Sequence, residues 1–355
     1  MQTHCVFWLA ALLLSVSGCA TPYVPPPRSY PLREPWRGVA LLHLEDLDGR
    51  RGYGTAACEA SIDNAVAVGV NAISLRVPAR QPSIHDPQIR FGVEPPHGET
   101  DARIVAAIRQ SRDRGLSVML KPHIMLDRIT DKEWRGRIDF EDPADLDEWW
   151  RNYNTFVLHY ANLAETENVE CFCVGVELLD MVRRAPERWS RLIKDVRTIY
   201  NGKLTYAANW DEEFQVVPFW GELDMVGVQC FFPVTESEQP TQIELREGMQ
   251  AIAEELHRVA RDNGKTLLLT EVGFKSTRGA TIKPWEWPSE DTVVDLQQQA
   301  RAYEAVLDVL EIRPWFAGLF WWNWLTEPAP GDKADRIFTP QDKPAEALLR
   351  ERWGR

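Results

Sequence analysis

A series of eight short apolar runs limits the fold of this chain more than any other feature of its sequence. Each run is rich in β-branched and aromatic residues and is followed by an amphipathic stretch. Near-continuous apolar runs are typical of parallel strands, because a parallel sheet is covered on both faces. We expect strands at residues 38–44, 71–78, 117–124, 171–178, 203–210, 223–233, 266–274 and 316–324.

Helical patterns separate these runs. They lie at residues 55–68, 100–114, 143–165, 186–200, 241–263, 292–312 and 341–352, and only the crossover around 212–222 is short. Gly115, Gly202 and Gly264 stand just before the next strand, where a left-handed residue ends a helix. Eight strand–helix units close most simply into a (β/α)8 barrel. An open doubly wound sheet is the alternative, but no glycine-rich nucleotide-binding loop is present.

Chain length and charge narrow the classes of function. The span 36–355 holds about 320 residues without a low-complexity linker, which fits one large domain. The formal net charge of −13 argues against nucleic acid and other anionic polymers as partners. Neutral polysaccharides or oligosaccharides remain, and we expect a monomer.

The cysteines of this span do not predict a metal site. Cys58, Cys171, Cys173 and Cys230 lack the spacing of metal ligands. Cys171 and Cys173 are two apart in an apolar strand and therefore share a face. We expect buried free thiols, with a disulfide left open.

The amino terminus has the features of an export signal. The apolar run from Val6 to Val16 is too short to span a bilayer as a mature helix, so residues 1–18 are expected to be a signal peptide. It ends in Val16-Ser-Gly-Cys19, which resembles the lipobox of bacterial lipoproteins. This resemblance implies cleavage before Cys19 and a lipid on its sulfur. An ordinary secretory signal remains the alternative.

Residues 19–35 are expected to be a proline-rich tether between this lipid and the barrel domain. Ala20, rather than Asp, follows the cysteine, which by resemblance to lipoprotein sorting signals favours the outer membrane. The sequence leaves open which face of that membrane carries the domain.

Two glutamates, Glu177 and Glu271, stand at the carboxyl ends of the fourth and seventh expected strands. A carboxylate there is costly unless it serves chemistry or has a partner, and barrel active sites lie at these ends. Retaining hydrolysis of a glycosidic bond needs two carboxyl groups about 5 to 5.5 Å apart. Strands four and seven face each other across a barrel, so the pair predicts this reaction. Structural ion pairs with Lys121 or Arg76 are the alternative.

Other polar and aromatic residues at or just beyond strand ends are expected to bind sugar. Pyranose rings stack on indoles, and the chain has fifteen tryptophans. Lys121 and His123 are two apart and therefore point to one side of their strand. A structural histidine, and core packing of Trp285 and Trp287, remain alternatives. No second histidine at ligand spacing supports a metal, and no cofactor is expected. The candidate residues are Arg76, Lys121, His123, Asn209, Trp210, Trp285, Trp287, Trp322 and Asn323.

Segments from the third to the eighth expected strand resemble glycoside hydrolase family 113. They are Leu120-Lys-Pro-His123, Cys173-Val-Gly-Val-Glu177-Leu, Leu204-Thr-Tyr-Ala-Ala-Asn209-Trp210, Leu223-Asp-Met-Val-Gly-Val, Thr270-Glu271-Val-Gly-Phe and Phe320-Trp-Trp-Asn-Trp324. The resemblance implies a clan A barrel, a retaining mechanism and β-1,4-mannan or manno-oligosaccharides as substrate. It also implies Glu177 as acid/base, Glu271 as nucleophile and Trp322 as a platform beneath the sugar.

Two positions depart from this resemblance. Val176 stands where clan A enzymes commonly have an asparagine for the sugar 2-hydroxyl, a bond that Asn209 could supply instead. Phe231 stands where relatives often have a tyrosine near the nucleophile. A hydrolase of another β-glycan therefore remains an alternative, as does a lipoprotein that binds glycan without cleaving it.

Overall fold

The chain folds into a closed barrel of eight parallel strands in sequence order. The computed structural model describes residues 35–42, 52–93, 99–130, 133–327 and 336–354. The expected (β/α)8 single domain is confirmed, and each expected apolar run contains a strand. The strands are β1 (Trp36–Leu42), β2 (Ala72–Gln81), β3 (Ser117–Leu126), β4 (Cys171–Val176), β5 (Lys203–Asn209), β6 (Met225–Cys230), β7 (Thr266–Val272) and β8 (Phe316–Leu325).

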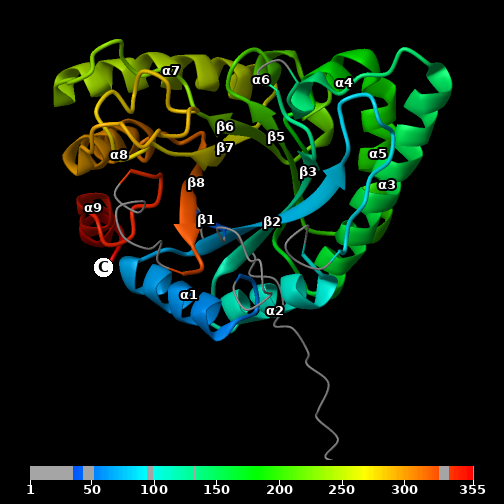
Figure 1. The fold of residues 1–355 in the computed structure, drawn as a ribbon, viewed down its shortest axis with the longest axis horizontal. Coiled ribbons are helices and arrows are strands. Elements are labelled where there is room, and N and C mark those ends of the chain that lie inside the picture. Colours follow the sequence, from blue (N-terminus) through cyan, green and yellow to red (C-terminus); the bar gives the residue numbers. More distant parts are fainter. Residues whose placement is uncertain (1–34, 43–51, 94–98, 131–132, 328–335, 355) are drawn as a thin grey trace, which may run out of the picture.

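Helices surround the barrel on its outer side (Figure 1). Side-chain caps begin several of them, as at Thr55, Thr100 and Thr241, where a hydroxyl oxygen accepts a backbone N–H of the first turn. The long helices are α1 (Ala56–Val68), α2 (Asp101–Arg112), α3 (Pro143–Thr166), α5 (Pro186–Ile199), α7 (Gln242–Asp262), α8 (Leu296–Leu310) and α9 (Pro344–Trp353).

Short helical turns lie in the connections that the sequence patterns left as loops. These turns are too short to show the periodic apolar pattern by which a helix is recognised in a sequence. They are η1 (Arg135–Arg137), α4 (Leu179–Arg184), α6 (Glu213–Val216) and η2 (Trp220–Glu222). Helix α4 begins two residues after Glu177, and α6 and η2 occupy the short crossover between β5 and β6. These turns position the site.

The barrel interior is apolar at the amino ends of the strands and polar toward the carboxyl ends. A small cluster of interior side chains fills the lower level: Trp36, Ala72, Met119, Cys171, Met225, Leu268, Ala317 and Phe320. Two residues farther along β3 than Met119, the same face carries Lys121, which is 1% exposed. A lysine at this depth needs a charged partner, so the change in polarity marks the floor of the site.

Aromatic residues fill the layer between the sheet and the helices. Trp149 stacks on Tyr153 with ring centroids 4.6 Å apart, and Trp321 stacks on Tyr303 of α8 at 3.6 Å. Trp324, also buried, donates its indole N–H to the Ser61 hydroxyl on α1 at 2.9 Å. These tryptophans are therefore core, and a high tryptophan count alone does not identify sugar platforms.

The four cysteines of the barrel are buried free thiols: Cys58, Cys171, Cys173 and Cys230. Burial raises the pKa of Cys173 to about 12 and the pKa of Cys58 to about 11, so both remain protonated at neutral pH. The expected signal peptide, Cys19 and the tether up to residue 34 lie outside the described residues. No helix in the described part of the chain is long and apolar enough to cross a membrane.

Candidate active site

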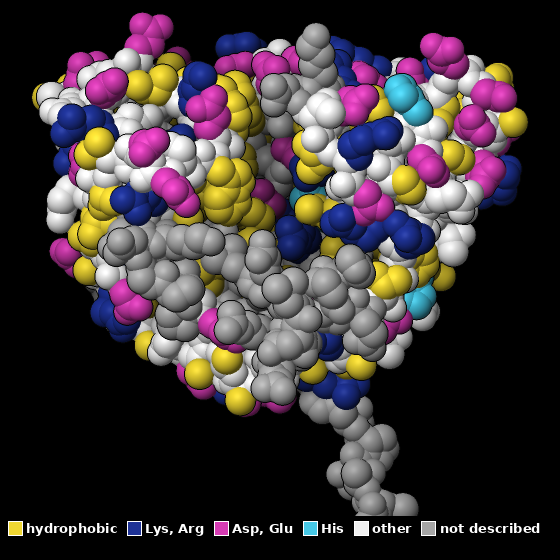
Figure 2. Space-filling view, in the orientation of Figure 1, with side chains coloured by type: hydrophobic (Ala, Val, Ile, Leu, Met, Phe, Trp, Pro, Cys, Tyr) yellow, Lys and Arg dark blue, Asp and Glu magenta, His cyan; other side chains and the backbone are white. Residues whose placement is uncertain are grey.

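The face of the molecule shown in Figure 2 is hollowed near its centre. Hydrophobic side chains gather on one wall of this hollow, and lysine or arginine side chains gather on the other. Glu177 directly follows β4, and Glu271 lies near the end of β7. Burial raises the pKa of Glu271, and the charge of Glu177 adds to this rise.

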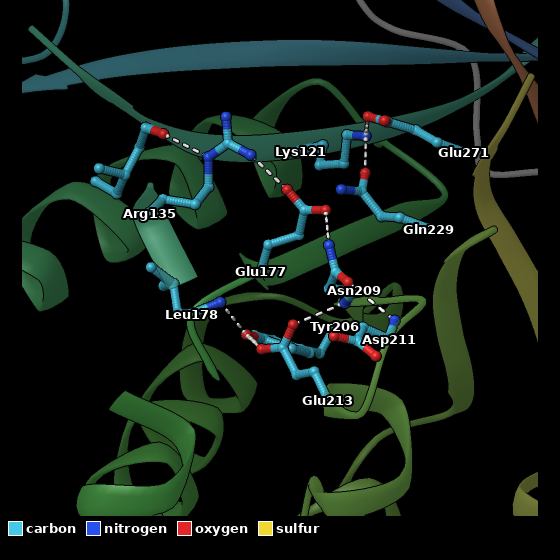
Figure 3. Close-up of polar contacts among 11 residues, drawn as sticks. Lys121, Arg135, Glu177, Leu178, Tyr206, Asn209, Asp211, Glu213, Gln229 and Glu271 are labelled. Atoms are coloured by element: carbon cyan, nitrogen blue, oxygen red, sulfur yellow. Dashed lines mark hydrogen bonds and ion pairs between the residues drawn. The ribbon is translucent and has the colours of Figure 1, made fainter. Parts of the chain in front are cut away.

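Glu271 is held from inside the barrel. The Lys121 ammonium group of β3 donates to its Oε1, and both side chains are buried. Lys121 Nζ also lies 3.3 Å from Oε1 of Gln229 on β6 (Figure 3). Burial raises the pKa of Glu271 above its ordinary value, and the charge of Lys121 opposes that rise. The lysine therefore favours the ionised carboxylate that a nucleophile requires.

Glu177 sits where β4 departs from regular geometry. The pairing of β4 with β5 shifts register between Cys173 and Val176, and Glu177 has a left-handed φ of 52°. Gly175 is required within this shift, because a Cβ there would come within 2.8 Å of the Trp189 and Tyr206 rings. The shift directs the Glu177 side chain toward the centre of the site (Figure 3).

Two side chains from neighbouring segments contact the Glu177 carboxyl. Nδ2 of Asn209, the last residue of β5, donates to Oε1 at 2.7 Å. Arg135 of η1 donates to Oε2, and its Nε also donates to the Ile124 carbonyl at 3.0 Å. Asn209 Oδ1 accepts from the Asp211 backbone N–H at 2.9 Å. Asn209 therefore makes one hydrogen bond within the protein at each end of its amide, and its second N–H remains for a ligand.

Two buried polar side chains near the site, His123 and Asn323, have no protein partners in the described part of the chain. Both ring nitrogens of His123, and both amide atoms of Asn323, have no hydrogen-bond partner among the described residues. Burial, with the charges of Arg135 and Lys121, holds the pKa of His123 well below its ordinary value, so its ring is neutral. Burial also lowers the pKa of Arg76, whose charge interacts with that of Glu271. Buried groups of this kind can bond a ligand hydroxyl at little desolvation cost.

Aromatic side chains extend the site beyond the carboxylates. Trp210, next to Asn209, stacks on Trp285 with centroids 4.9 Å apart and 24° between planes. Trp285 is 40% exposed and Trp322 is half-buried, so each can offer a surface to a sugar. Trp287 instead packs edge-on against Phe338 at 5.1 Å and is 54% exposed.

The two positions that depart from the family resemblance are both apolar. Val176 is 1% exposed and packs with Cys173 inside the barrel. Phe231 meets Phe338 edge-on at 6.4 Å. With phenylalanine at position 231, the hydrogen bond described for the Glu271 carboxyl group comes from Lys121 instead of a phenol.

Three residues of the site were not among the residues predicted from the sequence: Arg135, Tyr206 and Glu213. Gln229 differs from them, because it is a polar residue at the end of an apolar strand, the pattern by which the other candidates were found. Arg135 and Glu213 lie in short connections, in which no period tells a buried charge from a solvated one.

No group of His, Cys, Asp or Glu side chains within the described ranges could hold a metal ion. The two carboxyl groups of the site have different partners. One is paired with a buried ammonium group, and the other bonds a neutral amide and a partly exposed guanidinium. A barrel with two such carboxyl groups at the ends of β4 and β7 has the layout of a glycoside hydrolase.

Comparison with known proteins assigns the family. The model of Glycoside Hydrolase Family 113 matches residues 47–342, and the chain belongs to this family. A solved GH113 β-1,4-mannanase has a TM-score of 0.78 at 25% identity, over 90% of this chain and 99% of that one. The GH113 β-mannanase AaManA from Alicyclobacillus acidocaldarius, in complex with ManMIm, has a TM-score of 0.77 at 28% identity, over 90% and 96%.

More distant structures share the fold alone. A β-glucuronidase from Ruminococcus gnavus has a TM-score of 0.61 at 11% identity, and this chain covers half of it. No curated protein sequence matches. The family model and the mannanase structures together make this chain a glycoside hydrolase.

Proposed function

We propose that this glycoside hydrolase cleaves β-1,4-linked mannan or manno-oligosaccharides with retention of anomeric configuration. The observation that carries the proposal is the pair Glu177 and Glu271 at one end of the barrel, each with its own set of partners. Support for the substrate comes from the GH113 β-mannanases that share the fold at 25–28% identity. The net charge of −13 also favours a neutral glycan.

In the first step of the proposed reaction, Glu271 attacks the anomeric carbon. Lys121 favours its ionised form, and Glu177 donates a proton to the departing glycosidic oxygen. The sugar remains bonded to Glu271 as the leaving sugar departs. In the second step Glu177 takes a proton from water, the oxygen of that water attacks the same carbon, and Glu271 leaves as a carboxylate. Two inversions at one carbon give net retention.

The proposed sugar contacts come from the buried groups without protein partners and from the aromatic wall. His123 and Asn323 supply hydrogen bonds to hydroxyls, and Trp322 supplies a stacking surface. Trp210 and Trp285 form one stacked pair, so they present a continuous edge to a sugar and not a slot between two rings. This pair fits a neighbouring subsite.

The test is hydrolysis of mannotetraose by the protein without residues 1–18, with product anomers followed by NMR. We expect the β-anomer first, with turnover lost in Glu177→Gln and in Glu271→Gln. First release of the α-anomer would contradict retention. Cleavage of cellotetraose or xylotetraose, but not of mannotetraose, would keep the mechanism and overturn the substrate.

We also propose that the protein is a lipoprotein of the bacterial envelope, anchored through Cys19 and held off the outer membrane by its proline-rich tether. The support is the sequence Val16-Ser-Gly-Cys19 followed by Ala20. Metabolic labelling with a radioactive fatty acid should mark the wild-type protein and not Cys19→Ser. Equal labelling of both would contradict the anchor.

A further inference from the structure

A buried carboxyl group beneath the site has no part in the proposed reaction. Glu213, the first residue of α6, is 0% exposed. Its Oε2 accepts the backbone N–H of Asn209 at 2.7 Å, and its Oε1 accepts the hydroxyl of Tyr206 at 2.6 Å. The Tyr206 oxygen in turn accepts the backbone N–H of Leu178 at 2.7 Å. Figure 3 shows this chain of bonds below Glu177.

Both arms of this network end at neighbours of Glu177. Leu178 is the next residue in the chain, and the side chain of Asn209 donates to Glu177 Oε1. The left-handed backbone of Glu177 is a conformation that surrounding contacts must hold in place. Asn209 alone therefore separates Glu213 from the Glu177 carboxyl on one route, and Tyr206 and Leu178 separate them on the other. It links β4 to β5 at the point where the acid/base candidate leaves the barrel.

A purely structural role explains Glu213 poorly. No ion pair with Glu213 forms among the described residues, so its burial is not offset by a direct positive partner. Burial raises the pKa of Glu213 to about 8, the bonds from Tyr206 and Asn209 oppose this rise, and the charge of Glu177 adds to it. An apolar residue would fill the same space at lower cost. What the carboxyl group adds is two acceptors in fixed directions.

We propose that Glu213 is a positioning residue that, through Tyr206 and the Asn209 backbone, fixes the Glu177 carboxyl for proton transfer to the leaving group. This role rests on the proposed assignment of Glu177 as acid/base. It predicts a loss that depends on how much the leaving group needs a proton. A residue that only stabilised the fold would affect all substrates equally.

The experiment compares kcat/KM for two substrates. Mannotetraose needs a proton on its leaving oxygen, whereas 2,4-dinitrophenyl β-mannoside has a leaving group that departs as an anion. For Glu213→Leu we expect a loss of about 10- to 100-fold on mannotetraose and less than about 3-fold on the activated mannoside. Glu213→Gln keeps one acceptor for Asn209 and a donor toward Tyr206, and should stay within about 3-fold of wild type on both.

Tyr206→Phe is the second variant, because it removes one hydroxyl from the network and leaves Glu213 in place. We expect a loss of roughly 3- to 10-fold on mannotetraose alone. Equal losses on both substrates, for whichever variants fold, would overturn the positioning role. So would an unchanged kcat/KM for Glu213→Leu.

Wild-type protein that cleaves neither mannoside would overturn the proposed substrate without deciding this role. Amide hydrogen exchange of Leu178 and Asn209 then decides it. The network is supported if the Leu178 amide exchanges faster than in wild type in both Glu213→Leu and Tyr206→Phe. The Asn209 amide should also exchange faster in Glu213→Leu, and Glu213→Gln should keep wild-type rates at both amides. Unchanged exchange in both disruptive variants overturns it.

Discussion

Glu271 is held from inside the barrel by Lys121 of β3, whereas Glu177 is held by Asn209 at the end of β5 and by Arg135 in the connection that follows β3. The Lys121 side chain that contacts Glu271 is 1% exposed, and the Arg135 side chain that contacts Glu177 is 21% exposed. Water screens the second ion pair more than the first. The nucleophile candidate thus has its ion-pair partner in the buried interior of the barrel. The candidate that must gain and lose a proton has partners at the rim.

This difference matters because the two groups have opposite needs during the proposed reaction. A nucleophile works only when ionised, and a buried ammonium group favours that state. An acid/base must be stable in both protonation states, which a neutral amide such as that of Asn209 allows. The structure separates these requirements between two levels of the same barrel.

The largest expected effect is the loss of the nucleophile. Glu271→Gln keeps the size of the side chain but cannot form the sugar ester, so we expect kcat on mannotetraose to fall on the order of 10⁴-fold or more. Asp262→Asn, which removes the charge of an exposed ion pair with Arg261, is the control and should retain full activity. Activity of Glu271→Gln within tenfold of wild type would contradict the assignment.

The second largest expected effect is on stability, and it comes from loss of the buried Lys121 ammonium group. Lys121→Met leaves Glu271 buried without its partner, and we expect the free energy of unfolding to fall by about 3–5 kcal/mol in urea titrations. Arg261→Met breaks an exposed pair and should change it by less than about 1 kcal/mol. The double variant Lys121→Met, Glu271→Gln should recover part of the loss. Equal losses of unfolding free energy in Lys121→Met and Arg261→Met would contradict the proposed difference between the buried and the exposed ion pair.

Glu213 should make stability depend on pH. Its pKa is about 8 in the folded protein, against an ordinary value of 4.5. Between these values only the folded state holds the proton, so the free energy of unfolding falls as pH rises, by at most about 1.4 kcal/mol per pH unit. Below about pH 4.5 both states are protonated, and the penalty disappears.

Glu213→Gln lacks this titration and provides the comparison. We expect the free energy of unfolding of Glu213→Gln minus that of wild type, both from urea titrations, to be about 2–4 kcal/mol larger at pH 8 than at pH 5. A constant difference between the two proteins would show that Glu213 is ionised throughout and would remove the predicted pH dependence.

The smallest expected effects come from removing one hydrogen bond near Glu177 or one near Glu271. Asn209→Ala removes the 2.7 Å bond to Glu177, and we expect a loss of about 10- to 100-fold in kcat/KM on mannotetraose. Gln229→Ala removes a 3.3 Å bond to Lys121, which keeps Glu271 as its partner, and should cost less than about fivefold. A larger loss in Gln229→Ala than in Asn209→Ala would show that activity depends more on the contacts around Glu271 than on those around Glu177.

Most of the barrel could be predicted because its signals are local in sequence. Each apolar run became a strand, and polar residues at strand ends such as Lys121, Glu177 and Glu271 came together because all parallel strands end at one mouth. Backbone direction and side-chain alternation suffice for that inference.

The connections could not be predicted in the same way. Arg135 reaches Glu177 from 42 residues earlier in the chain, and that contact depends on how η1 packs against α4 and β3. Glu213 follows Asp211 and Glu212 in a segment whose composition indicates a solvated turn, yet its side chain is fully buried. Which of three adjacent acids points inward is decided by the packing of Tyr206 and Asn209 above α6.

The most direct test of the account is to trap the covalent intermediate. Incubation with 2-deoxy-2-fluoro-β-mannosyl fluoride slows the breakdown of a sugar ester, because fluorine destabilises the positively charged transition state, while the fluoride departs readily. Mass spectrometry of the intact protein and its peptides should show one fluorosugar, attached to Glu271. A label on Glu177, or no label in protein that hydrolyses mannotetraose to the α-anomer, would contradict the account.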